Sequence, residues 1–170
     1  KYPDIKILGI NKSQDAQDTI TVLEKNGIKI AVLNYTYGLN GIALPSDMPY
    51  AVNLLDEEKV KADIASAKEQ SDFVIVCPHW GTEYSLQPDS MQKKWTKIFA
   101  ESGADLVLGT HPHVIEPIEW VEDETTGHQM LVYYSLGNFV NWTSSSGDGI
   151  ANRMVGGMAE ITVGFDEAGL

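Results

Sequence analysis

Hydrophobic residues in this sequence gather in short runs, separated by longer stretches with helical periodicity. The segments Ile28–Tyr35 and Phe73–Cys77 are mostly apolar and rich in β-branched residues, and Leu106–Leu108 is a shorter run of the same kind. Runs of this length and composition predict buried strands, as in the middle of a parallel sheet. The pattern therefore predicts strands that alternate with helices.

Three helices are predicted from apolar spacing and from residues typical of helix ends. Ser13 is the expected N-cap of a helix that runs through Asn26, with Gly27 as the residue that ends it. Asp56 begins the second helix, with acidic residues in its first turn, and the third helix covers Pro88–Ser102.

The rest of the chain has strand-like patterning. Ile5–Ile10 and Met158–Phe165 are predicted as short strands, and Ile115–Val121 and Gln129–Ser135 flank a polar segment in the manner of an antiparallel hairpin. The predicted fold class is therefore α/β, with a layered, partly parallel sheet and a β-rich end. The long segment Thr36–Leu55 is a predicted loop, and loops of this length are often functional.

Composition narrows the class of protein. The chain has 170 residues, which fits one domain, and its 43% hydrophobic and 21% charged residues exclude intrinsic disorder. Cys77 is the only cysteine, so no intrachain disulfide can form, and no apolar run is long enough to cross a bilayer. The formal net charge of −12 would repel a phosphate backbone, so nucleic acid is not an expected partner.

Three of the four histidines follow predicted strands. His79 comes directly after Phe73–Cys77 and Pro78, and His111 and His113 follow Leu106–Leu108. Ligands of α/β sheets bind at the carboxyl ends of the strands, so these imidazoles are expected at one edge. Imidazole is a common ligand of Zn, Fe, Mn and Ni, and three together indicate a metal or catalytic site.

Metal binding by these histidines depends on local geometry and has a structural alternative. A single histidine at a strand end is more often a hydrogen-bonding residue than a ligand. In an extended His-x-His the side chains point to opposite faces, so His111 and His113 need a turn between them to share one ion. Glu83, four residues after His79, is a candidate carboxylate ligand or acid/base.

Four further residues are candidate substrate contacts, each with a structural alternative. Trp80 and Tyr84 lie close to His79 in the sequence and can line a pocket or cover the core. Asn138 follows a predicted strand and can bind substrate or form a turn. Arg153 is the only basic residue after Lys97, so it is a candidate anion contact or the partner of a surface carboxylate.

Four stretches combine into a specific set of motifs. They are Gly27-Ile-Lys-Ile-Ala-Val-Leu-Asn-Tyr-Thr, His79-Trp-Gly-Thr-Glu-Tyr, Gly103-Ala-Asp-Leu-Val-Leu-Gly-Thr-His-Pro-His-Val and Tyr134-Ser-Leu-Gly-Asn-Phe-Val. In this order, across about residues 27–140, they resemble the bacterial capsule-synthesis CapA family, which is associated with poly-γ-glutamate biosynthesis. That family is similar to the calcineurin-like metallophosphoesterases, so the resemblance implies a layered α/β/β/α sandwich with a two-metal site.

The resemblance also implies roles for individual residues. His79, His111 and His113 are the expected metal ligands, although Thr110 separates Gly109 from His111 in the matching Gly-His-x-His motif. The expected cofactors are divalent metal ions, namely Mn, Fe, Zn or Mg. The residues expected to act on the substrate are Glu83 and His113 in catalysis and Trp80, Tyr84, Asn138 and Arg153 in binding.

The chain departs from the family at its beginning. Full members start with Gly-Asp, Asn-Leu-Glu and Asn-Asn-His segments that supply further metal ligands, and none of these precedes the first matching motif at Gly27 in this sequence. We therefore expect a single CapA-like domain in its C-terminal portion, with an incomplete sandwich and part of the two-metal site missing. Missing strands expose a sheet edge, which favours a homodimer.

The predicted function is capsule or poly-γ-glutamate biosynthesis, with metal-dependent hydrolysis of a phosphoester or related bond in the complete protein. The alternative is a non-catalytic component of polymer synthesis or export. Expected partners are polymer-synthesis or export proteins and an anionic polymer or phosphoester substrate. The expected location is the extracytoplasmic side of the bacterial cell envelope.

Overall fold

The computed structural model describes residues 5–165, which form an α/β fold. The elements, in chain order, are α1 (Gln14–Asp18), β1 (Thr21–Lys25), β2 (Ile28–Thr36), α2 (Glu57–Gln70), β3 (Phe73–His79), α3 (Ser90–Glu101), β4 (Leu106–Leu108), β5 (Ile118–Glu122), β6 (Gln129–Tyr133) and the 3₁₀ helix η1 (Ala151–Met154). The predicted α/β class is confirmed.

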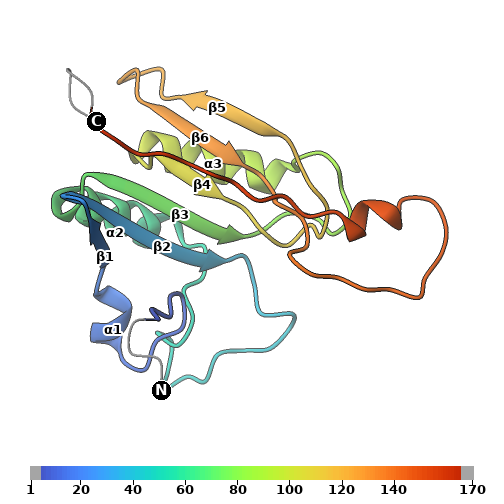
Figure 1. The fold of residues 1–170 in the computed structure, drawn as a ribbon. Helices are drawn as coiled ribbons and strands as arrows, with labels where there is room; N and C mark the ends of the chain where they lie inside the picture. The colour runs from blue at the N-terminus through green and yellow to red at the C-terminus, as the bar shows by residue number, and fades with distance from the viewer. Residues whose placement is uncertain (1–4, 166–170) are drawn as a thin grey trace.

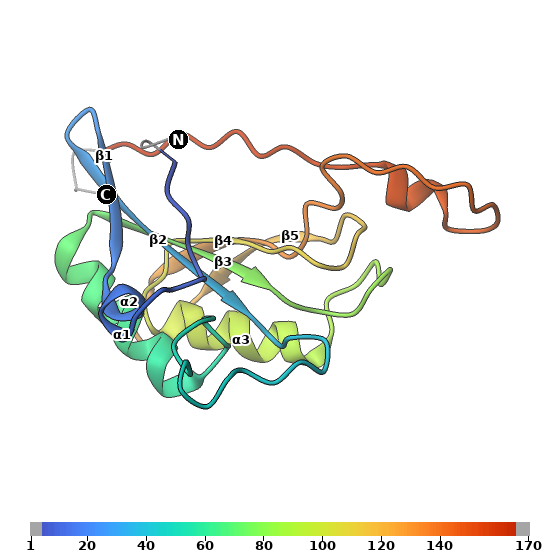
Figure 2. The ribbon, with the colours of Figure 1, turned by 90° about the horizontal axis from the view of Figure 1, so that it is seen from below.

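One six-stranded sheet organises the molecule, in the order β1-β2-β3-β4-β6-β5 (Figure 1). The four inner strands are parallel, while β1 and β5 at the two edges run antiparallel to their neighbours. Helices α2 and α3 connect parallel strands, and both lie on the same face of the sheet (Figure 2). All four parallel strands therefore end at one edge, where ligands bind in such sheets.

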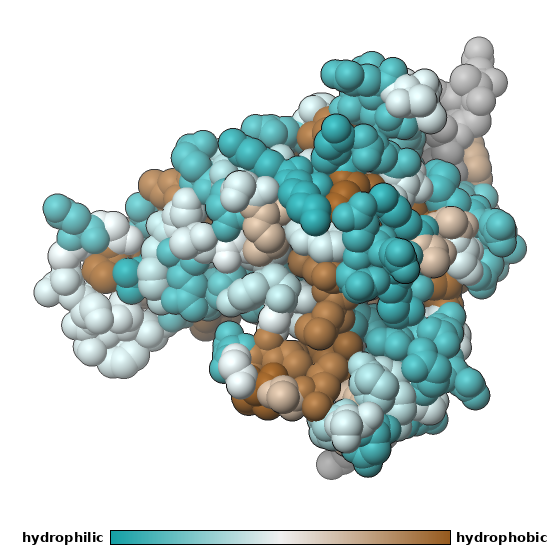
Figure 3. All heavy atoms as spheres, turned by 180° about the vertical axis from the view of Figure 1, so that it is seen from behind, coloured by the Kyte–Doolittle hydropathy of each residue, from teal (hydrophilic) through white to brown (hydrophobic). Residues whose placement is uncertain are grey.

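The core lies between this face of the sheet and the two long helices. Helix α2 turns Val60, Ile64 and Ala67 inward against β2 and β3, and α3 contributes Trp95 and Phe99. The α2 side chains and Phe99 are fully buried, and Trp95 is nearly so. Complete burial of a large apolar side chain contributes about 1.5–3 kcal/mol, so these stripes fix the helices on the sheet. The surface of the helical layer that faces away from the sheet is mainly hydrophilic (Figure 3).

Both helices begin directly after an acidic residue that caps them. The Asp56 carboxylate accepts a hydrogen bond from the Lys59 N–H at 2.9 Å. Asp89 and Gln92 form a reciprocal capping box, in which each side chain bonds to the backbone of the other. The two predictions of helices at 56 and within 88–102 are therefore confirmed.

The second face of the sheet has no helical cover among residues 5–165. The C-terminal extended segment crosses it instead (Figures 1 and 2). The described residues thus supply one sheet and one helical layer of the layered sandwich that the family resemblance implies.

The prediction of one helix from Ser13 to Asn26 was wrong beyond Asp18. The Ser13 hydroxyl does cap α1, accepting from the Ala16 N–H at 3.2 Å, but the chain then enters β1. Residues 19–23 are rich in β-branched side chains, and Asn26 and Gly27 both have positive φ. Asn-Gly favours a tight hairpin turn, so local turn chemistry decides for a β1–β2 hairpin here.

Two predicted terminal strands are also absent from the structure. Ile5–Ile10 forms no strand, and only Ile10 makes an isolated bridge, with Val52. Met158–Phe165 runs extended along the sheet without joining it as a strand. The predicted hairpin within 115–135 is confirmed as the antiparallel pair β5 and β6.

Candidate metal centre

The predicted histidine edge forms where β3 and β4 end. His79 is the last residue of β3, and Thr110, just beyond β4, makes a parallel bridge with it. The Thr110 N–H donates to the Pro78 carbonyl at 3.0 Å and extends the strand pairing beyond β4. This pairing places the ring centroids of His79 and His111 4.5 Å apart.

A tight turn brings His111 and His113 to one side. Both have positive φ, 105° and 61°, in a region that residues other than glycine seldom adopt. Their ring centroids lie 5.9 Å apart. The structure therefore contains the turn that two histidines in a His-x-His sequence need in order to share one ion. Backbone strain of this kind occurs most often at functional sites.

Glu83 reaches these histidines because the loop after β3 is tied to the loop after β4. The Tyr84 N–H donates to the Pro112 carbonyl at 2.7 Å. Glu83, His111 and His113 each offer one ligand atom, and these atoms all lie within 4.8 Å of one another. Two ligands on opposite sides of one ion are about 4.4 Å apart, twice a bond of about 2.2 Å. Small side-chain rotations therefore suffice to place all three donors on one ion.

The chemistry of the donor set fits a divalent transition metal. Two imidazoles and one carboxylate suit Mn, Fe or Zn better than Mg, which prefers oxygen ligands. His79 lies outside the three-donor group but beside His111, so its imidazole faces the same region.

Asn138 fixes the orientation of His113. Its Oδ1 accepts from Nδ1–H of His113 at 2.8 Å, which leaves Nε2 with a lone pair for a metal. The Asn138 side-chain amide donates to the His113 carbonyl at 3.0 Å and to the Arg153 carbonyl at 2.9 Å. All three hydrogen bonds are made within the protein, so Asn138 supports the His113 ring and the turn that carries it.

The surroundings of the histidines favour their neutral form. Partial burial, together with the neighbouring imidazoles, lowers the pKa of His79. Partial burial also lowers the pKa of His111, an effect that the nearby Glu83 carboxylate opposes. Neutral imidazole is the form that binds metals, so both rings are suited to that role near pH 7.

The other predicted substrate contacts occupy different positions. Tyr84 is exposed, and its ring lies 5.9 Å from the His113 ring and 3.5 Å from the guanidinium carbon of Arg153. Trp80 is instead fully buried, and its indole Nε1–H donates to the Tyr134 carbonyl at 2.9 Å. The structure therefore brings Tyr84 and Arg153 beside the histidine cluster and places Trp80 in the core.

Tyr37 is a member of this cluster that sequence analysis did not identify. It follows β2 directly, and its ring centroid lies 6.1 Å from that of His79 and 5.1 Å from that of His111. Its N–H donates to the His79 carbonyl at 3.0 Å. Its position after a predicted central strand was the available signal, because β2 ends at the same edge as β3 and β4.

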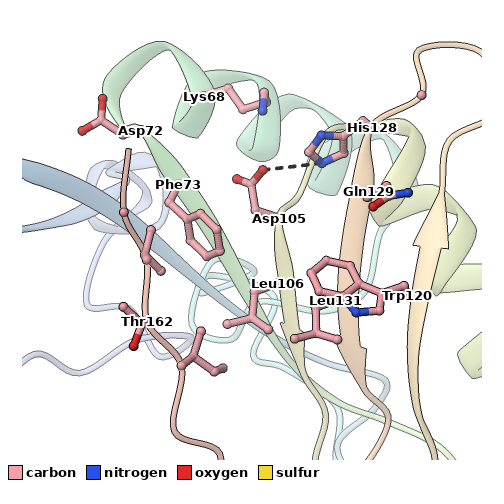
Figure 4. Close-up of a pocket in the computed structure, with 14 residues that line it drawn as sticks. Lys68, Asp72, Phe73, Asp105, Leu106, Trp120, His128, Gln129, Leu131 and Thr162 are labelled. Atoms are coloured by element: carbon pink, nitrogen blue, oxygen red, sulfur yellow. Dashed lines mark ion pairs between the residues drawn. The ribbon is translucent and has the colours of Figure 1, made fainter. Parts of the chain in front are cut away.

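A separate cavity of about 640 Å³ lies toward the opposite edge of the sheet (Figure 4). Phe73, Leu106 and Leu131 form part of its wall. His128 lies at one end, 3.5 Å from the Asp105 carboxylate. None of the predicted site residues lines this cavity, so the histidine cluster and the cavity are separate features.

Comparison with known proteins agrees with the motifs. The family model described as bacterial capsule synthesis protein PGA_cap matches residues 1–143. The chain belongs to this family. The PGA biosynthesis protein CapA of Bacillus subtilis is 37% identical to it over 145 residues, and the capsule biosynthesis protein CapA of Bacillus anthracis is 29% identical over 151 residues. The predicted family resemblance is confirmed.

The matches cover unequal shares of the proteins compared. The two curated relatives match 82% and 84% of this chain, which in turn covers 36% and 35% of their lengths. This PGA_cap chain therefore spans about a third of each relative. The solved structure of Haemophilus influenzae NAD nucleotidase matches 76% of this chain and 28% of its own, with 11% identity and a TM-score of 0.45.

Within residues 5–165, no helix combines the length and the apolar character needed to cross a bilayer.

Proposed function

We propose that the protein containing this chain uses a divalent metal ion, held by His111, His113 and Glu83, to hydrolyse a phosphoester during capsule or poly-γ-glutamate biosynthesis. The observation that carries the proposal is the convergence of the three ligand atoms within 4.8 Å. When bound, such an ion activates water and stabilises charge on phosphoryl oxygens. His79, beside His111, remains a predicted ligand of the same ion or of a second one.

The protein's own residues support the proposal in three ways. The turn after β4 aims both imidazoles to one side, and Asn138 holds His113 in one orientation. The exposed carboxylate of Glu83 is open to water, as a group that binds an ion or moves a proton must be.

The context is proposed from the family and its relatives. We propose that the chain works with polymer-synthesis or export proteins on the extracytoplasmic side of the cell envelope. The names of the Bacillus relatives refer to PGA and capsule biosynthesis, which supports this context. The net charge of −12 opposes broad contact with a polyanion, so we propose that an anionic substrate is held locally.

The test is hydrolysis of bis(p-nitrophenyl) phosphate by the purified protein with and without Mn²⁺. We expect Mn²⁺-dependent turnover that falls by about 100-fold or more in His111→Ala and Glu83→Gln, because each removes a donor from the ion. His128→Ala is the matched control, since it removes an imidazole from the opposite edge of the sheet. Equal turnover in wild type and in both site variants would contradict the proposal. Mn²⁺ binding without turnover would favour the non-catalytic alternative.

A further inference from the structure

The surroundings of the metal centre contain one cation with an unusual environment. Arg153 is the only arginine in the chain, and no lysine follows Lys97. The same part of the sequence, from residue 101 onward, is rich in acidic residues. Nevertheless, no ion pair joins Arg153 to any carboxylate within residues 5–165. The positive charge is therefore not neutralised by the part of the chain that the structure describes.

The Arg153 side chain is held in place by an aromatic ring. The guanidinium carbon lies 3.5 Å from the centroid of the Tyr84 ring, a close cation–π contact. The Tyr84 ring in turn lies 5.9 Å from the His113 ring. The Tyr84 ring therefore lies between the predicted metal ligand His113 and the Arg153 guanidinium.

The Arg153 backbone is fixed to the same site. The Arg153 carbonyl accepts hydrogen bonds from the side-chain amides of Asn138 at 2.9 Å and Asn141 at 3.0 Å. Because Asn138 also bonds to His113, one side chain joins the metal ligand to the residue that carries the guanidinium.

One donor of this guanidinium lacks an acceptor. Nε of Arg153 is buried and has no hydrogen-bond partner within the described residues. A buried N–H without a partner costs about 1–3 kcal/mol, and most such groups in folded proteins are paired, so this donor is an exception. Guanidinium donors form paired, charge-assisted hydrogen bonds with phosphate or carboxylate oxygens.

We infer that Arg153, stacked on Tyr84, is the anion-recognition residue of the metal centre and holds an oxyanion of the substrate beside His113. The inference rests on the proposed function, because it deepens the account of the same site. The oxyanion belongs either to the phosphoester or to a carboxylate of a γ-linked glutamate chain. Phosphate and carboxylate groups each offer two oxygens that can accept hydrogen bonds from one guanidinium.

The experiment measures binding of inorganic phosphate and of γ-glutamylglutamate to the purified protein by isothermal titration calorimetry, with and without Mn²⁺. We expect Arg153→Met to weaken binding of the recognised anion by about 10- to 100-fold, as for loss of charge-assisted hydrogen bonds. Arg153→Lys keeps the charge but not the paired donors, so it recovers only part of this loss. Loss of phosphate affinity alone assigns the phosphoester as the source, and loss of dipeptide affinity alone assigns the polymer carboxylate.

Paired variants of Tyr84 test the stacking. Tyr84→Phe keeps the ring face and is expected to bind the anion within about twofold of wild type, whereas Tyr84→Leu loses about 5- to 10-fold. Lys97→Met, which removes a positive charge from exposed helix surface, is the control and leaves anion affinity unchanged. Thermal unfolding of each variant separates these effects from loss of the fold.

The outcomes separate the two proposals. Equal binding of both anions to wild type and Arg153→Met overturns the role of Arg153, whether or not Mn²⁺ binds. If the protein takes up no Mn²⁺ but its anion binding still depends on Arg153, the role of Arg153 is upheld and the metal-dependent function is refuted.

Discussion

Replacing Asn138 by alanine tests whether this side chain positions the metal ligand His113. The substitution removes three hydrogen bonds of 2.8, 3.0 and 2.9 Å, one to the His113 ring and two to backbone carbonyls. Each contributes about 0.5–1.5 kcal/mol, and all are partly exposed, so we expect a loss of about 2 kcal/mol in the free energy of unfolding.

The effect on metal binding has a different origin. Without the acceptor at Nδ1, the His113 ring loses its fixed orientation and tautomer. Loss of such an outer hydrogen bond weakens metal binding by about 10- to 100-fold, equivalent to about 1.4–2.7 kcal/mol. Titration with Mn²⁺ by calorimetry measures this loss directly, at a temperature where both proteins are folded.

Asn141→Ala is the matched control for this prediction. Asn141 donates to the Arg153 carbonyl at 3.0 Å, as Asn138 does, but among the described residues it makes no hydrogen bond to the His113 side chain. We expect Asn141→Ala to change the Mn²⁺ affinity by less than about threefold. Equal Mn²⁺ affinities for wild type, Asn138→Ala and Asn141→Ala would refute the reasoning.

Three further predictions concern the edge of the sheet and its support. In Gly109→Ala the new Cβ overlaps a backbone carbonyl and a buried indole, so chemical denaturation is expected to show a loss of about 1–3 kcal/mol, whereas Gly38→Ala, in open space, shows little. Burial raises the pKa of Glu116, so its charged form destabilises the fold at neutral pH. Glu116→Gln should raise the unfolding temperature at pH 7, with a gain that shrinks as the pH falls toward about 4.5 and is absent below it, and a gain constant with pH would contradict this. The lowered pKa values of His79 and His111 keep both rings neutral above about pH 6.5. Mn²⁺ affinity should therefore be constant from pH 7 to 8 and should fall only below about pH 6.5, and a steady fall from pH 8 downward would contradict the assignment.

The parallel strands could be predicted because their apolar sequences match their central position in the sheet. Ile28–Tyr35 and Phe73–Cys77 are mostly apolar, and the structure places both in the middle of the sheet, with the residues facing the helices buried and the alternate residues half-buried. The carboxyl ends of such strands share one edge by topology, so the meeting of His79 with His111 followed from strand order alone.

Other features could not be predicted from periodicity. The helical spacing of Ala16, Ile20 and Leu23 pointed to a helix, but the Asn26-Gly27 turn and strand pairing outweighed it. The turn at His111 depends on two residues with positive φ, which local sequence alone does not specify. Tyr37 joins the site through its position after β2, and its role depends on three-dimensional neighbours rather than on a motif.

The central claim is that Glu83, His111 and His113 bind one divalent metal ion. Anomalous diffraction at the manganese edge, from crystals of the protein grown with Mn²⁺, tests this most directly. We expect a peak within about 2.0–2.3 Å of one imidazole nitrogen from each histidine and one carboxylate oxygen of Glu83. A well-ordered structure without a peak among these three residues, at saturating Mn²⁺, would contradict it.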